Sequence, residues 1–183
     1  MIIAAMYNPI LSQVAGLITL LMMIISYLFK NKSSFLLCQT IGLAFMFFSY
    51  MFENEYFAMI ALTISLARTL VFFIYEKYNK PAPLALSFLV SALIIGSYVT
   101  VNCIILKTTK SVDLLYLIAQ IMYAFIFRIR KINLVRCTVI IPHVFAITYN
   151  VVLEGMLFVA ISYFLELLAD IFSIFKSRYQ KNP

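Results

Sequence analysis

Long apolar runs, each broken by a short cluster of charged or polar residues, repeat along the whole chain. A bilayer span needs roughly 20 apolar residues, and these runs are continuous rather than alternating, so the pattern predicts membrane-spanning helices. The fifth run is the shortest, and the sixth contains a proline, Pro142. The seven predicted spans cover residues 9–29, 35–52, 56–75, 83–106, 114–127, 137–153 and 156–175.

Composition points to the same class of protein. Of the 183 residues, 64% are hydrophobic and 11% are charged, whereas soluble domains are about half apolar and about a quarter charged. Seven spans also leave no room for a soluble catalytic domain. We therefore expect an all-α integral membrane protein in which residues 1–183 form a single polytopic domain.

The positive charges gather on one side of the predicted spans. With seven spans, the N-terminus and the segments after spans two, four and six share one side, which carries only Lys107 and Lys110. By the positive-inside rule, the N-terminus then faces outside and the C-terminal tail, residues 176–183, faces the cytoplasm. The other side carries eleven positive residues, namely Lys30, Lys32, Lys77, Lys80, Arg128, Arg130, Lys131, Arg136, Lys176, Arg178 and Lys181.

The net charge of +7 would also suit a nucleic-acid-binding protein. Here the charges are spread over short segments next to the predicted spans, so anionic lipid headgroups of the bilayer explain them more simply. No nucleic-acid partner is expected. The predicted outer loops carry the acidic residues Glu53, Glu55, Asp113 and Glu154.

An internal repeat appears when the chain is shifted against itself by 99 residues. Nine of the 46 pairs between residues 32 and 77 are then identical, and basic loops align with basic loops. Span four has no counterpart and inverts the second triple, so both triples have the same orientation. The predicted architecture is seven transmembrane helices in two parallel three-helix repeats, residues 9–75 and 114–175, joined by a linker helix, residues 83–106 (3+1+3).

Four ionisable side chains lie inside predicted spans: Arg68 in the third, His143 in the sixth, and Glu166 and Asp170 in the seventh. A charge in the hydrocarbon costs several kcal/mol, so these groups should face the bundle interior. Glu166 and Asp170 are four residues apart and share one helix face. At a rise of about 1.5 Å per residue, they and Arg68 fall near the midplane.

Two interpretations of these charges remain open. In the functional one, Arg68 binds an anionic group or closes against the acids, one carboxylate exchanges a proton, and His143 relays protons. In the structural one, a static buried ion pair holds spans three and seven in register. His143 then hydrogen-bonds a neighbour or the carbonyl that Pro142 leaves free. With two acids and one arginine, one carboxylate has no positively charged partner.

Motifs of enzymes and cofactor proteins are missing from the sequence. It contains no P-loop, G-x-S-x-G or HExxH motif, and its single histidine cannot form a bis-His haem site. We therefore expect no catalytic activity, no cofactor and no metal. The remaining polar residues of the spans should form helix-to-helix hydrogen bonds or line a cavity, and they are Gln13, Gln39, Ser65, Gln120, Thr148 and Asn150.

Several short motifs resemble the YgjV family of small bacterial inner-membrane proteins. The resemblance covers most of the chain and implies a multi-pass protein of the bacterial cytoplasmic (inner) membrane, without implying an activity. Ser65 stands where the family pattern has an Asn, and the pair Glu166 and Asp170 matches none of its motifs. The matching motifs are Gln13-x-x-Gly16, the basic loop with Lys30 and Lys32, Arg68-Thr69-Leu70 and Tyr149-Asn150.

The predicted layout also looks like that of the SWEET and PQ-loop transporters, although no Pro-Gln dipeptide occurs and the likeness is one of architecture alone. We therefore expect a small-solute transporter or facilitator, monomeric or homo-oligomeric. Arg68, Glu166, Asp170 and His143 would lie on the pathway of the solute or a proton. The alternative is a non-transporting membrane protein that binds a protein partner or anionic lipid, with a purely structural buried ion pair.

Overall fold

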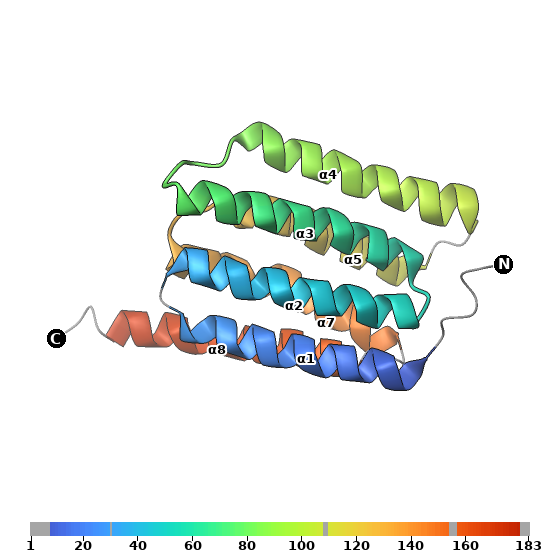
Figure 1. Ribbon diagram of the computed structural model, residues 1–183, viewed down its shortest axis with the longest axis horizontal. Helices are drawn as coiled ribbons and strands as arrows, with labels where there is room; N and C mark the ends of the chain where they lie inside the picture. The colour runs from blue at the N-terminus through green and yellow to red at the C-terminus, as the bar shows by residue number, and fades with distance from the viewer. Residues whose placement is uncertain (1–7, 30, 108–109, 154–156, 180–183) are drawn as a thin grey trace.

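The computed structural model describes residues 8–29, 31–107, 110–153 and 157–179, without the side chains of residues 27–28 and 173–179. All regular elements in these ranges are helical (Figure 1). They are α1 (Pro9–Leu28), α2 (Lys32–Phe52), α3 (Tyr56–Lys77), α4 (Leu84–Tyr98), the π-helix η2 (Val99–Ile105), α5 (Ser111–Ile126), α6 (Ile132–Thr138), α7 (Ile140–Val152) and α8 (Leu157–Tyr179).

Asparagine side chains begin the first two helices. The Oδ1 atom of Asn8 accepts a hydrogen bond from the backbone N–H of Leu11, and Pro9 occupies the first turn of α1. Proline suits this position because its missing N–H would have no partner there. Pro9 therefore starts a helix. Asn31 caps α2 in the same way through the N–H of Ser33.

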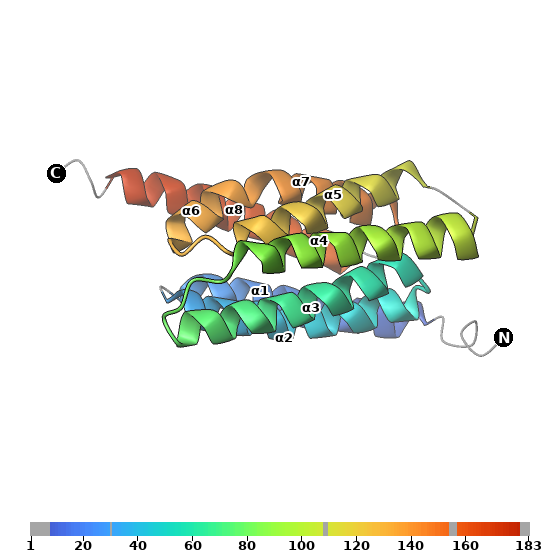
Figure 2. The same ribbon diagram turned by 90° about the horizontal axis from the view of Figure 1, so that it is seen from above.

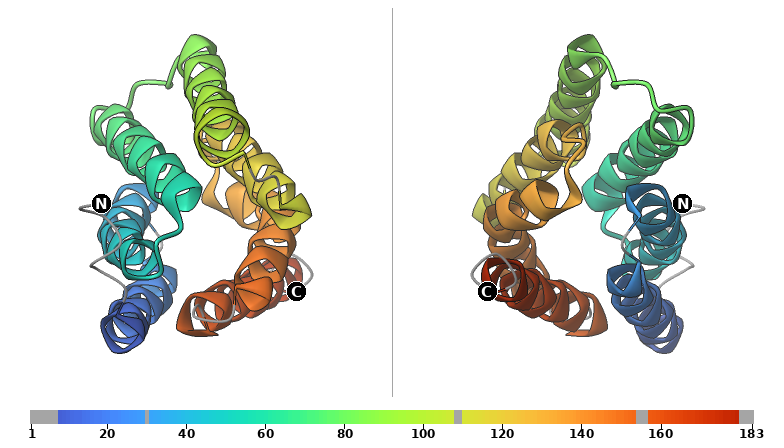
Figure 3. Two further views of the ribbon diagram at one scale, coloured as in Figure 1. Left: turned by 90° about the vertical axis from the view of Figure 1, so that its right-hand side faces the viewer. Right: turned by 90° about the vertical axis from the view of Figure 1, so that its left-hand side faces the viewer.

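The helices form two facing layers (Figures 2 and 3). One layer consists of α1, α2 and α3 in that order, and the other of α8, α7, α5 and α4. At the two edges, α1 packs against α8 and α3 packs against α4. The layers therefore meet at both sides and enclose an interface between them.

The sixth predicted span, 137–153, corresponds to two helices, α6, which already begins at Ile132, and α7. The two helices are bent by 46° against each other and pass together as a candidate span. Pro142 has no N–H to donate to the carbonyl of Thr138, so the helix bends about one turn before the proline. Because of this break, the described part of the chain has eight α-helices where seven spans were predicted.

Length and composition support membrane spans for much of the chain. Within the described residues, four segments are long and apolar enough, namely Pro9–Ser26, Lys32–Phe52, Tyr56–Lys77 and Leu84–Ile105, the last formed by α4 and η2 together. The bent pair α6 and α7 would be a fifth. Helix α5, with 16 residues, is shorter than the roughly 20 residues of a typical span.

Apolar side chains cover much of the outer surface of the described helices, and polar side chains are buried between the helices together with an apolar core. Large apolar side chains face outward, such as Phe88, Ile104 and Phe172, which are 59%, 63% and 71% exposed. Polar side chains such as Gln120 and Asn150 are buried between the helices. This is the distribution expected when the surrounding solvent is hydrocarbon.

Candidate functional site

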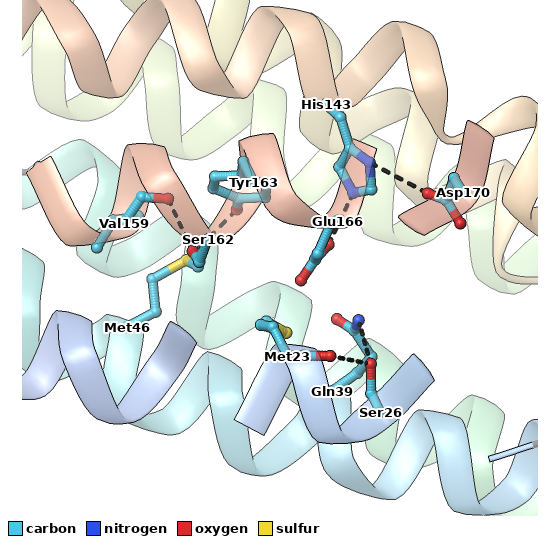
Figure 4. A network of polar contacts seen from close by, with 10 residues as sticks. All are labelled: Met23, Ser26, Gln39, Met46, His143, Val159, Ser162, Tyr163, Glu166 and Asp170. Atoms are coloured by element: carbon cyan, nitrogen blue, oxygen red, sulfur yellow. Dashed lines mark hydrogen bonds and ion pairs between the residues drawn. The ribbon is translucent and has the colours of Figure 1, made fainter. Parts of the chain in front are cut away.

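His143 lies between the two acidic residues of α8, at the contact of α7 and α8 (Figure 4). Its Nε2 atom is 2.9 Å from Oε2 of Glu166, and its Nδ1 atom is 3.5 Å from Oδ2 of Asp170. All three side chains are at most 4% exposed. The shared helix face predicted for Glu166 and Asp170 is thus present, with a histidine rather than an arginine against it.

The two carboxylates bear on the protonation state of His143. A neutral imidazole has one donor nitrogen and one acceptor nitrogen, whereas an imidazolium has two donors. Because each nitrogen of His143 faces a carboxylate oxygen, the imidazolium matches Glu166 and Asp170 together. In this protonated form, His143 supplies the positive charge that two acids against Arg68 leave unmatched.

Arg68 is buried on α3 but does not bind either acid. Its Nη1 atom donates to the backbone carbonyl of Gln120 at 3.4 Å, and its guanidinium lies 5.2 Å from the centre of the Phe127 ring. Across the described residues, no carboxylate is within ion-pair distance of it. The predicted strut between spans three and seven is therefore not formed, and α3 is attached to α5 instead.

A side-chain hydrogen bond holds Gln120 beside Arg68. The hydroxyl of Ser65 donates to Oε1 of Gln120 at 2.6 Å, so the residue one turn before Arg68 connects α3 to α5. This confirms the helix-to-helix role predicted for both residues. Thr148 is different, because its hydroxyl is exposed and donates to the carbonyl of Val144 within its own helix.

Arg68, His143 and Glu166 line one cavity between the two layers. Its volume is about 20 Å³, on a scale on which one water molecule needs roughly 10–15 Å³. Asp170 lies behind His143 and is not part of the lining. The complete lining is Met23, Gln39, Leu43, Arg68, Gln120, Tyr123, Phe127, His143, Tyr163 and Glu166.

Four lining residues carry polar atoms without a hydrogen-bond partner among the residues that the structure describes. One is Nδ1 of His143, which lies 3.5 Å from Oδ2 of Asp170. The other three are Nε of Arg68, the hydroxyl of Tyr123 and Oε1 of Glu166. A buried polar atom without a partner typically costs about 1–3 kcal/mol. These atoms are therefore the groups that a water molecule, ion or solute in the cavity would satisfy.

Helices α1 and α2 contribute only uncharged side chains to the cavity lining. Gln39 extends from α2 toward the carboxylate of Glu166 across the space between the layers (Figure 4). Its Nε2 atom donates to the hydroxyl of Ser26 at 3.4 Å, and Ser26 donates to the carbonyl of Met23. The sequence indicated Gln39 as one of few polar residues in a span, but Tyr123 and Tyr163 gave no such signal because aromatics are abundant in every apolar run.

Aromatic rings fill the interface between the cavity and the α2–α3 end of the bundle. Tyr116 and Tyr149 stack with ring centroids 4.5 Å apart, and Tyr50 packs edge-on to Tyr116 at 6.0 Å. The hydroxyl of Tyr50 donates to Oδ1 of Asn150 at 2.7 Å. All three tyrosines are 0% exposed, so this end of the interface is closed.

A second polar pair lies beyond the tyrosines. Asp113 was predicted in an outer loop, but it is in the first turn of α5, is 5% exposed, and accepts a hydrogen bond from Nδ2 of Asn102 at 2.9 Å. Asn102 belongs to η2, and this local widening of the helix cannot be foreseen from an apolar run. Lys110 and Glu55 form an ion pair at 3.1 Å near the same end.

The basic end of the bundle is partly buried. Lys32, predicted in a basic loop, begins α2, is 7% exposed and pairs with Glu76 at 2.9 Å. Arg128 and Arg130 donate to the carbonyls of Ala82 and Asn79, which attaches the α5–α6 connection to the α3–α4 connection. Lys30, Glu154, Lys176, Arg178 and Lys181 lie outside the residues whose side chains are described.

The acidic cluster is not arranged for a metal ion. Glu166 and Asp170 approach opposite nitrogens of the His143 ring, so the three side chains do not converge on one point. Within the described ranges, no group of three or more His, Cys, Asp or Glu side chains does so.

Comparison with known proteins gives one match. Residues 10–180 match the family model Imp-YgjV, described as bacterial inner membrane protein. No curated protein and no solved structure matches the chain. The match spans both helix layers and every described residue that lines the cavity.

Proposed function

We propose, from the premise that the chain belongs to the YgjV family of bacterial inner membrane proteins, that it is a small-solute transporter and has no catalytic activity. The observation that carries this proposal is the buried cavity lined by Arg68, His143 and Glu166. Charged groups inside a membrane protein are expensive to bury and typically mark a substrate or ion pathway. Asp170 belongs to the same site, because its Oδ2 atom lies 3.5 Å from Nδ1 of His143.

The proposed architecture is two parallel three-helix repeats around this cavity, with α4 and η2 as the linker. Shifted by 99 residues, α2 covers residues 131–151 and α3 covers residues 155–176. In the second half, α6 and α7 together run from Ile132 to Val152, and α8 runs from Leu157 to Tyr179. Helix boundaries that repeat within three residues support the sequence repeat. Transporter sites typically lie between such repeats, near the midplane.

The proposed orientation places the N-terminus outside and the C-terminus in the cytoplasm. Lys32, Lys77, Arg128 and Arg130 lie near the ends of helices that meet at one end of the bundle, and Lys110 lies near the other end. The positive-inside rule then supports a cytoplasmic position for the first end. The tyrosines between the cavity and the α2–α3 end would close the outer side.

Uptake into proteoliposomes tests transport directly. The purified protein would be reconstituted and supplied with a broad panel of labelled metabolites and inorganic ions, with and without a pH gradient. We expect at least one solute to accumulate, and Arg68→Gln to abolish its uptake. Arg128→Gln is the matched control, because it removes an arginine that contacts the carbonyl of Ala82 outside the cavity lining.

The basic end of the bundle, with Lys32, Lys77, Arg128 and Arg130, favours a second function. A non-transporting protein would use these cations to bind anionic lipid or an acidic protein partner, and its buried charges would only stabilise the bundle. In that case no solute accumulates, and Arg68→Gln lowers stability without changing any flux. Arg128 and Arg130 are already held by backbone carbonyls, which makes this function the weaker candidate.

A further inference from the structure

We propose that the cavity binds one small monovalent anion together with one proton, and that Glu166 carries the proton. The inference rests on the proposed transport function and names its substrate class. It follows from three properties of the cavity: the hydrogen-bond donors that face it, the balance of its charges and its size.

Donors converge on the cavity from separate helices. Nε of Arg68 on α3 and the hydroxyl of Tyr123 on α5 are buried, line the cavity and have no partner in the described part of the chain. The hydroxyl of Tyr163 on α8 donates only to the sulfur of Met46, at 3.4 Å, and a thioether is a weak acceptor. A guanidinium beside one phenol without a partner and another with only a weak acceptor is a binding site for an anion.

The charges of the site are balanced before anything binds. Arg68 and an imidazolium at His143 carry two positive charges, and Glu166 and Asp170 carry two negative charges when ionised. An anion alone would leave a net negative charge in the membrane interior, which is costly. A proton that enters with the anion keeps the site neutral.

Glu166 is the group placed to take this proton. Its Oε1 atom has no partner within the described chain and faces the cavity side, while Oε2 is held by His143. Protonation at Oε1 turns an acceptor, which would repel an anion, into a donor that can bind it. Helices α1 and α2 contribute only uncharged side chains to the lining. The titratable groups around the cavity are therefore Arg68, Tyr123, His143, Tyr163, Glu166 and, behind His143, Asp170.

The volume of the cavity limits which anions can bind. A cavity of about 20 Å³ holds one or two water molecules, which is the space taken by chloride or formate. A dicarboxylate is too large and carries a second charge that the site does not balance. The expected cargo is therefore a monovalent anion of one to a few heavy atoms.

Calorimetric titration of the purified full-length protein in detergent tests the inference without requiring transport. Sodium formate and sodium chloride are the probes, sodium succinate is the size and charge control, and buffers of different ionisation enthalpy report proton uptake. We expect formate or chloride to bind with uptake of one proton per anion, and succinate not to bind. Arg68→Gln should weaken binding about ten- to a hundredfold, the loss of a charge-assisted hydrogen bond.

Glu166→Gln keeps the inference testable if Arg68→Gln does not fold. Glutamine resembles the protonated acid, so this variant should bind the anion with no proton uptake and little dependence on pH. The matched control is Glu55→Gln, which removes a carboxylate paired with Lys110 at the bundle end and should leave both affinity and proton uptake unchanged.

Three results would overturn the inference: no binding of formate or chloride, binding without proton uptake in the unmodified protein, or unchanged binding in a folded Arg68→Gln variant. The two proposals fail separately. Anion binding with no flux of any solute in proteoliposomes overturns transport and leaves the anion site. Uptake of another class of solute without anion binding overturns the anion site and leaves transport.

Discussion

The rings of Tyr50 and Tyr149 lie side by side with centroids 6.3 Å apart, although 99 positions separate the two residues in the chain. Ninety-nine is also the offset at which the two halves of the sequence align, so these tyrosines are equivalent residues of the proposed repeats. Equivalent side chains meet where a pseudo-two-fold axis passes between repeats. The facing order of α1, α2, α3 against α8, α7, α5 is the one such an axis produces.

Tyr116, stacked on Tyr149, should close the cavity toward this end. We expect Tyr116→Ala to open a path and to raise the rate at which a thiol reagent modifies Leu43→Cys, a position in the cavity lining. The reaction would be followed by mass spectrometry in detergent, in a protein whose three native cysteines are replaced.

Tyr116→Phe is the control for this measurement. The ring, which fills the space, is kept, and the hydroxyl that is lost has no hydrogen-bond partner among the described residues. Its modification rate should equal that of the protein with the native tyrosine. Equal rates for Tyr116→Ala and Tyr116→Phe would show that the aromatic stack does not limit access.

The burial of the charged residues could be predicted from the sequence, but their pairing could not. An arginine and two acids within apolar runs must turn inward, whatever the rotation of each helix. The contact of His143 with Glu166 depends on how α7 is rotated, and the 46° bend before Pro142 changes that rotation relative to a straight helix. Helix periodicity alone therefore favoured Arg68 as the partner of the two acids.

The aromatic residues of the site could not be predicted from the sequence either. Tyr123 and Tyr163 line the cavity, yet a tyrosine in an apolar run suits a membrane interface, a packed core or a polar cavity. Asp113 was assigned to a loop because charges interrupt spans. Its partner Asn102 comes from η2, and this contact allows the carboxylate to be buried within the first turn of a helix.

His143 should stabilise the bundle through the two acids it separates. His143→Ala leaves Glu166 and Asp170 buried without their positive partner, and removal of one member of a buried ionic cluster costs about 3–5 kcal/mol. We expect a clear loss of thermal stability in detergent, measured by circular dichroism or by a thiol-independent dye assay.

Neutralising the acids should reverse much of this loss. In the triple variant His143→Ala, Glu166→Gln, Asp170→Asn, all three charged members of this buried cluster are gone, so its unfolding midpoint should exceed that of His143→Ala alone. If the triple variant is the less stable of the two, then packing around the imidazole matters more than its charge.

The orientation can be tested with C-terminal fusions. With the C-terminus in the cytoplasm, a fusion of green fluorescent protein should fluoresce and a fusion of periplasmic alkaline phosphatase should be inactive, because each reporter works on only one side of the membrane. Fusions after Asn54, in the α2–α3 connection, should behave in the opposite way. Phosphatase activity at the C-terminus would contradict the orientation, and phosphatase activity at both positions would also contradict the odd number of spans.

Gly16 should control how closely α1 approaches α8. A Cβ atom at this position would lie 3.1 Å from Cβ of Phe158, whereas a Cβ at Gly96 on α4 would meet nothing within 4 Å. Small residues at helix contacts let backbones approach within a membrane, and forced overpacking typically costs about 1–3 kcal/mol. Gly16→Val should therefore lower the thermal midpoint in detergent, and the matched variant Gly96→Val should not. Equal midpoints would mean that α1 and α8 can separate freely, which would remove one edge of the enclosed interface.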